Sequence, residues 1–224
     1  VSDGLLSRMR TRKDEAERAA LEKAGRITDE ILASLAQLFA SGAALTEVEV
    51  AQAVEREALS RGAEGLGFET LAAWPGRSWG IHPFPAYTAG PFGGEGMSIL
   101  DFGVTVDGYT SDVTVTAAKG RLSPAQETML ALVQQAYDAA VSSCRAGASP
   151  QEPARAAEAV FGAAGRSMPH SLGHGIGLDA HEGPLIRASG EPSDPELAPG
   201  MTFTIEPGLY HPEHGGVRLE HDIR

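Results

Sequence analysis

Apolar positions recur at helical spacing in the first part of the chain. Between about residues 14 and 41 they fall every three or four positions, at Leu21, Ala24, Ile27, Ile31, Leu35 and Leu38. This stripe predicts an amphipathic helix with one face against a core. A second helix is predicted to begin at Thr46, which forms a capping box with Glu49, and to end near Ser60. Strand-like residues follow from about Gly67 to Ala73.

The same order of elements recurs in the second half. The segment "SPAQ" at Ser123 is a helix start signal, and this helix is predicted to run to about Cys144. The segment "SPQE" at Ser149 predicts another helix, ending near Ala164. Helices followed by strands in each half favour a domain with internal pseudo-symmetry, although long α/β chains without symmetry show similar patterns.

Alternating residues from 97 to 116, "MSILDFGVTVDGYTSDVTVT", predict a β-hairpin that turns at Asp107-Gly108. In this register Asp101 and Asp112 share one face, diagonally across the two strands and ~7–8 Å apart at the backbone. Gly103 lies between them and would leave room for a ligand.

The other face of this hairpin is apolar and is expected to join the core. Two carboxylates that lie close on the remaining face repel each other unless a proton or a cation intervenes. The alternative is a solvated face, but such a face is expected to contain lysines, and this one has none. The pattern therefore favours a cation site.

Two further segments place carboxylates on the polar side of apolar strands. In "MTFTIEP" (201–207), Glu206 alternates with the apolar residues. "GVRLEHDI" (216–223) is predicted to form one strand, with Arg218 and Glu220 on its polar face.

Three histidines lie in the segment "HSLGHGIGLDAHEGP" (170–184). His170 and His174 are four apart, the spacing of a metal pair on a helix. The interleaved glycines disfavour a helix and favour an extended, closely packed backbone. His181 would then need a bend in the chain to return to the same side.

Composition narrows the class of protein. The formal net charge is −12, from 30 acidic and 18 basic residues, and no basic patch indicates nucleic-acid binding. Cys144 is the only cysteine, which excludes an intrachain disulfide and a cysteine zinc site and suits a cytoplasmic protein. No apolar run approaches the ~20 residues that span a membrane.

Taken in order, four segments resemble the signature segments of the M24 metallopeptidases: "LDFGVTVDGYTSD", "GHGIGLDAHEGP", "MTFTIEPGLY" and "GGVRLEHD". The resemblance extends from about Met9 to Arg224. It implies an α+β, pita-bread fold, in which a pseudo-two-fold, curved antiparallel sheet is covered by helices. It also identifies residues 1–224 as the catalytic domain, with the amino-terminal domain of full-length relatives absent and the carboxyl-terminal end truncated.

The resemblance places two divalent metal ions on five residues of the expected types: Asp101, Asp112, His174, Glu206 and Glu220. Asp112 and Glu220 would bridge the two ions. Carboxylate ligands with one imidazole suit manganese, cobalt, iron or zinc alike. Manganese is the metal expected here, with cobalt, zinc or iron as alternatives.

Two positions make the resemblance closer to the Xaa-Pro aminopeptidase and Xaa-Pro dipeptidase (prolidase) group. His170 lies four residues before the metal-binding histidine, and Arg218 lies two before the last glutamate. The catalytic roles would fall on Glu206 as general base and on His181 and His170, which would hold the substrate carbonyl or oxyanion.

Substrate binding is assigned to His82 and Arg218, although a structural ion pair is an equal alternative for Arg218. The segment "RSWGIHPFPAYTAG" around His82 departs from the family, so the role of His82 and the substrate are open.

The implied activity is hydrolysis of a peptide bond, of the Xaa-Pro type, by a metal-activated hydroxide. The implied partners are a peptide with proline in second position and a second copy of the chain in a homodimer. Alternatives are a methionine aminopeptidase-like activity, a different hydrolase or lyase on the same scaffold, and a non-catalytic binding module.

Overall fold

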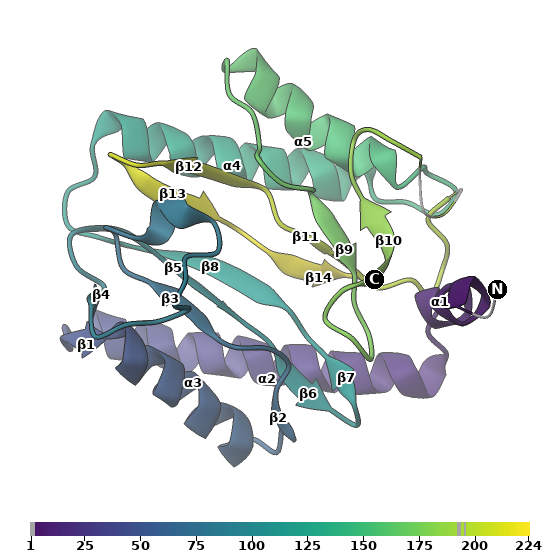
Figure 1. Ribbon diagram of the computed structural model, residues 1–224, viewed down its shortest axis with the longest axis horizontal. Coiled ribbons are helices and arrows are strands. Elements are labelled where there is room, and N and C mark those ends of the chain that lie inside the picture. The colour runs from purple at the N-terminus through teal and green to yellow at the C-terminus, as the bar shows by residue number, and fades with distance from the viewer. Residues whose placement is uncertain (1–2, 192–193, 195) are drawn as a thin grey trace.

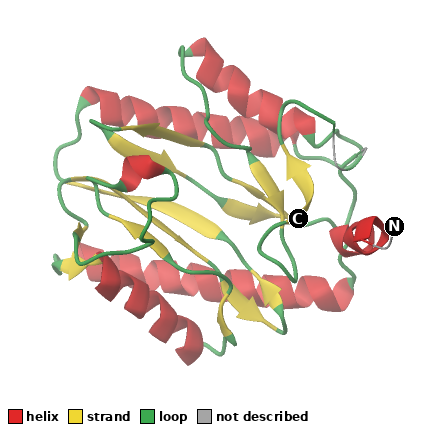
Figure 2. Ribbon diagram, viewed as in Figure 1, coloured by secondary structure: helices red, strands yellow, loops and turns green. Residues whose placement is uncertain are grey.

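The computed structural model describes residues 3–191, 194 and 196–224 of the chain. Four long helices border the strands in two pairs, as Figures 1 and 2 show. One pair is α2 (Glu15–Ala40) and α3 (Glu47–Ser60), and the other is α4 (Pro124–Ser143) and α5 (Gln151–Ala163). A short helix, α1 (Asp3–Thr11), precedes them.

The predicted helix starts are confirmed at two positions. Thr46 and Ser123 each accept a hydrogen bond from the backbone three residues on, and the reciprocal side-chain bond completes a capping box. Helix α5 begins one residue later than its start signal implied, because Pro150 takes the capping position, where its side chain accepts no hydrogen bond. Ser149 still accepts a hydrogen bond from the backbone of Gln151 at 3.3 Å.

Short strands form the sheets of the first half. They are β1 (Leu45–Thr46), β2 (Gly65–Leu66), β3 (Leu71–Ala73), β4 (Pro91–Phe92), β5 (Gly96–Phe102), β6 (Val104–Val106), β7 (Tyr109–Thr110) and β8 (Val113–Lys119). Strands β3, β5 and β8 form one sheet and β2, β6 and β7 another, while β1 pairs with β4. The strand predicted from Gly67 to Ala73 is shorter than expected, since only its last three residues pair.

The predicted hairpin is confirmed in its turn and register. Val106 pairs with Tyr109 across the turn, and Asp101 pairs with Thr114. The expectation for Gly103 is wrong. A Cβ atom at this position would lie 1.8 Å from the carbonyl oxygen of Ser111, so the space beside the glycine is filled by the partner strand.

The second half contains β9 (Gly173–Gly175), β10 (Glu182–Ile186), β11 (Phe203–Ile205), β12 (Gly208–His211), β13 (Gly215–Arg218) and β14 (His221–Ile223). Strands β10, β9, β11 and β14 form one sheet, and β12 and β13 form a hairpin. The prediction of a single strand over 216–223 is wrong in one respect. It is split at Leu219–Glu220, where the backbone of Glu220 bonds to Thr114 instead of to a neighbour in its own half.

Each half has its own apolar core, which supports the predicted pseudo-symmetry. The first core packs α2 and α3 against β5 and β6, with Ile31, Val54 and Phe102 fully buried. The second packs α4 and α5 against β11 and β13, with Phe161 and Ile205 fully buried. The bridge between Thr114 and Glu220 joins the two halves at the centre of the molecule. Within the described ranges, no helix is long and apolar enough to cross a membrane.

Candidate functional site

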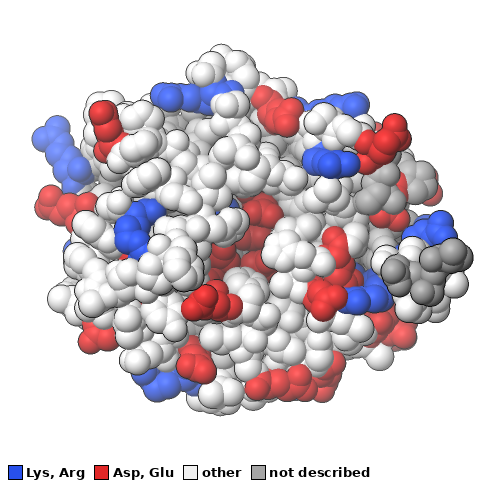
Figure 3. Space-filling model, in the orientation of Figure 1, with Lys and Arg blue, Asp and Glu red and all other residues white. Residues whose placement is uncertain are grey.

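The face of the molecule seen in Figure 3 is hollowed near its centre, and acidic side chains gather there. A pocket of about 510 Å³ opens between the two halves. Eight of the nine residues singled out from the sequence line it: His82, Asp101, Asp112, His170, His174, His181, Glu206 and Glu220. Arg218 is the exception.

The five expected metal ligands come from five different places in the fold. Asp101 lies on β5 and His174 on β9. Asp112 lies between β7 and β8, Glu206 directly follows β11, and Glu220 lies between β13 and β14. On β5 the neighbours of Asp101, Leu100 and Phe102, are buried in the core. Strand alternation therefore turns Asp101 toward the shared pocket.

Asp112, His174 and Glu220 form the compact centre of this group. Each offers a ligand atom, and these atoms lie within 4.8 Å of one another. The Nε2 atom of His174 is 3.8 Å from Asp112 Oδ2 and 3.5 Å from Glu206 Oε1. The Nδ1 atom of His174 is 3.0 Å from the carbonyl oxygen of Gly175, a contact in which Nδ1 donates and Nε2 keeps its lone pair toward the carboxylates.

Burial and neighbouring negative charges make the ionised form of these carboxylates unfavourable. Burial raises the pKa of Asp112 well above its ordinary value, and the neighbouring Glu220 and Asp101 raise it further. Burial likewise raises the pKa of Glu220, with Glu206 and Asp101 as further causes. The pKa of Glu206 rises to about 8, again through burial, although Arg218 opposes the rise. Burial lowers the pKa of His174 to about 4, so this ring is neutral near pH 7.

The donor set fits divalent cations. The Oδ1 atoms of Asp101 and Asp112 are both buried and have no hydrogen-bond partner among the described residues. Buried polar atoms are almost always satisfied, and unpaired buried carboxylates are costly. Cations bound by these carboxylates would satisfy the free oxygens and offset the crowded negative charge.

Arg218 lies beneath the pocket instead of lining it. It is 1% exposed, and its Nη2 atom donates to Asp101 Oδ2 at 2.6 Å. Its Nε atom donates to the hydroxyl of Thr114 at 3.0 Å, and that hydroxyl donates to Glu220 at 2.6 Å. The guanidinium therefore orients one carboxylate of the site directly and a second through a threonine.

Tyr210 is a residue of the site that the sequence analysis missed. Its hydroxyl accepts a hydrogen bond from Arg218 at 3.1 Å and lies 3.0 Å from Nε2 of His170. The other ring nitrogen of His170 is 2.8 Å from the carbonyl oxygen of Ser171. Both nitrogens are thus engaged. The sequence offered one signal for this residue, the strand pattern "GLYH" followed by the glycine-rich "GGVR". The two segments pair, and Tyr210 lies opposite Gly216.

The glycine-rich histidine segment is extended, as predicted. A Cβ atom at Gly175 would lie 1.8 Å from the carbonyl oxygen of Gly183, so β9 and β10 pack too closely for any larger residue. The chain bends between these strands, and the ring of His181 returns to lie 4.0 Å from that of His174, centroid to centroid. A helical metal pair of His170 and His174 is excluded.

His82 reaches the pocket from the loop that follows a short 3₁₀ helix at Ser78–Gly80. Burial lowers its pKa, and the charge of Arg218 adds to this effect. Phe84, on the same loop, lines the pocket and is 94% exposed. The unusual segment around His82 thus forms part of the pocket wall.

The chain resembles known proteins over nearly its whole length. Residues 19–224 match metallopeptidase family M24. The Xaa-Pro dipeptidase of Pyrococcus horikoshii is 34% identical over 224 residues, which cover 99% of this chain and 62% of that protein.

Solved structures agree with these sequence matches. The prolidase from Pyrococcus furiosus has a TM-score of 0.89 at 31% identity, covering 99% of this chain and 64% of that one. Dipeptidase PepE from Mycobacterium ulcerans also has a TM-score of 0.89 at 31% identity, covering 99% and 58%. These likenesses confirm the expected α+β, pita-bread fold. The chain spans 57% to 62% of the length of the curated relatives it matches.

Proposed function

Since the chain belongs to metallopeptidase family M24, we propose that it is the catalytic domain of a peptidase that cleaves Xaa-Pro bonds with the help of two divalent metal ions. The observation that carries this proposal is the convergence of Asp112, His174 and Glu220, with ligand atoms within 4.8 Å of one another, in a pocket that also holds Asp101 and Glu206. The names of the similar Xaa-Pro dipeptidase and prolidases support the choice of substrate.

In this proposal Asp112 and Glu220 would help to hold both ions, Asp101 would contribute to one site, and His174 with Glu206 would contribute to the other. Bound divalent ions would lower the pKa of a water molecule and polarise the scissile carbonyl. Four carboxylates and one imidazole suit manganese, cobalt, iron or zinc, and manganese is the metal we expect.

The chain's own residues would position the substrate and move protons. Glu206, at the edge of the ligand cluster, would accept the proton of the attacking water at a carboxylate oxygen and return it to the leaving nitrogen. His181, beside His174, would donate a hydrogen bond to the substrate carbonyl as it gains negative charge. His170, held by Tyr210, and His82 would line the substrate. Arg218 would keep Asp101 in place.

A panel of peptides tests this function. With added manganese, dipeptides and tripeptides that carry proline in second position should be cleaved, and Met-Ala should not. Cleavage of Met-Ala alone would favour the methionine aminopeptidase alternative. Absence of cleavage of any proline peptide by the metal-loaded, full-length protein would overturn the proposal. The homodimer and the cytoplasmic location stay predictions from the sequence.

A further inference from the structure

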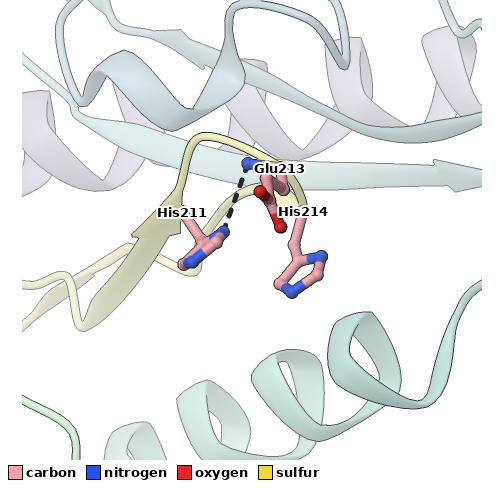
Figure 4. A group of neighbouring side chains, drawn as sticks. All are labelled: His211, Glu213 and His214. Carbon is pink, nitrogen blue, oxygen red and sulfur yellow. Dashed lines mark hydrogen bonds between the residues drawn. The ribbon is translucent and has the colours of Figure 1, made fainter.

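A second group of potential metal ligands lies outside the pocket, in the turn between β12 and β13. His211, Glu213 and His214 each offer a ligand atom, and these atoms lie within 4.8 Å of one another. Figure 4 shows both rings and the carboxylate at this turn, in the space between the hairpin and a helix. Both histidines are half-buried and Glu213 is exposed, so ions in solution can reach the group.

Hydrogen bonds fix the backbone of this turn before any ion binds. His211 pairs with Gly215 at the end of the hairpin, and the backbone of His214 donates to the carbonyl of His211 at 3.1 Å. Gly215 has a φ of 85°, as expected for a glycine that closes a three-residue hairpin loop. The side chain of Gln126 on α4 donates to the carbonyl of His214 at 3.1 Å and anchors the turn.

The two rings already lie against each other. Their centroids are 4.5 Å apart and their planes differ by 19°. The Nδ1 atom of His211 accepts a hydrogen bond of 3.2 Å from the backbone N–H of Glu213. This nitrogen therefore directs its lone pair into the turn, and an ion bound there would replace one long hydrogen bond with a metal–nitrogen bond.

We propose that this turn is a separate binding site for a divalent transition-metal ion of the zinc class. Two imidazoles and one carboxylate are a ligand set typical of zinc, with a fourth position open. Ligand atoms in a tetrahedral zinc site lie ~3.3 Å apart, so the accessible side chains would turn out of their stacked arrangement and bring the ligand atoms up to ~1.5 Å closer to complete the geometry.

The site is independent of the proposed catalytic centre, since none of its three residues lines that pocket. It is nevertheless connected to the pocket through the chain. His211 directly follows Tyr210, whose hydroxyl contacts His170 and Arg218. A bound ion would fix the end of the hairpin that carries this tyrosine.

Zinc binding by the whole chain tests the proposal. Equilibrium dialysis against increasing zinc, followed by elemental analysis, should show one more zinc ion per chain in the wild type than in the double variant His211→Ala/His214→Ala. Glu213→Gln should weaken this additional binding at least ten-fold. Glu158→Gln, which removes an exposed carboxylate on α5, is the matched control and should leave it unchanged.

Nitrogen NMR of the histidine rings gives a second readout that needs no variant. Zinc should shift the ring signals of His211 and His214 after the catalytic centre has been filled. Equal zinc content in the wild type and the double variant, or unshifted ring signals, would overturn the site. Neither measurement uses peptidase activity, so a failure of the proposed function would leave this result readable.

Discussion

Asp112 and Glu220 are the single residues on which the proposed metal centre depends most. Both are almost completely buried, burial raises the pKa of each, and the charge of Glu220 raises that of Asp112 further. We expect Asp112→Ala or Glu220→Ala to abolish binding of both metal ions, because in the proposed centre each would remove a ligand shared by the two. Elemental analysis and a peptidase assay check this. A variant that keeps both ions and the full rate would refute the bridging assignment.

His181 should behave differently from the ligands. Its ring lies tilted against that of His174, but His181 does not belong to the compact ligand group. We expect His181→Ala to lower kcat about 100-fold or more, as for the loss of one donor to a developing oxyanion, with the metal content unchanged. Loss of metal in this variant would show that His181 is a ligand.

Local patterns predicted where the four carboxylates of the proposed centre lie, while His174 was singled out by the family resemblance. Asp101 and Asp112 were placed on one face by the hairpin register, which the turn at Asp107-Gly108 determines. Tyr210 could not be predicted in the same way. A tyrosine on a short strand is ordinarily a packing residue. Its partners here are His170, from a distant segment, and Arg218, from the adjoining strand.

At the scale of elements, the segment between β3 and β4, which carries His82, is held by a carboxylate far away in sequence. Glu47, in the first turn of α3, is fully buried. It accepts hydrogen bonds from the backbone of Trp74 at 2.7 Å and of Thr88 at 2.5 Å, and it pairs with Arg77 at 2.5 Å. The loop that carries His82 thus depends on a helix that does not touch the pocket.

Glu47→Ala should therefore lower the free energy of unfolding by about 3 kcal/mol, since it leaves a partner charge and backbone donors without an acceptor. Thr46→Ala, one residue earlier, removes only a helix cap and should cost about 1 kcal/mol. Urea unfolding compares the two. The KM for peptide should rise in Glu47→Ala and stay the same in Thr46→Ala. Equal effects on KM would mean that the loop is positioned by other contacts.

Sequence patterns identified the helices and most strands but not this loop. Helical stripes and capping boxes are local, so α2, α3 and α4 followed from them. The loop has no hydrophobic periodicity. A glutamate in the first turn of a helix is ordinarily exposed, where its charge interacts favourably with the helix dipole. The split between β13 and β14 was not predicted, for a related reason. Alternation continues through Leu219 and Glu220, while the change of partner strand depends on the tertiary structure.

At the scale of the whole molecule, the pocket joins two halves that each have their own core, and the charges between the halves link their stability to metal and pH. Burial raises the pKa of Asp112, Glu206 and Glu220 in the folded protein. Between the unfolded and folded pKa values, the folded state binds more protons than the unfolded chain. The free energy of unfolding therefore falls as pH rises through this window, which for Glu206 extends from 4.5 to about 8.

Chelation should expose this dependence, and metal should remove it. With EDTA present, the free energy of unfolding should decrease between about pH 5 and about pH 8, because the ionised carboxylates repel one another without a counter-ion. With manganese bound, the carboxylates are ionised and paired, so the decrease should disappear and stability should rise with metal concentration. Urea unfolding at about pH 5 and about pH 8, with manganese or with EDTA, measures the free energy of unfolding under these four conditions. If chelated and metal-loaded protein show the same pH dependence, the buried carboxylates do not hold the ions.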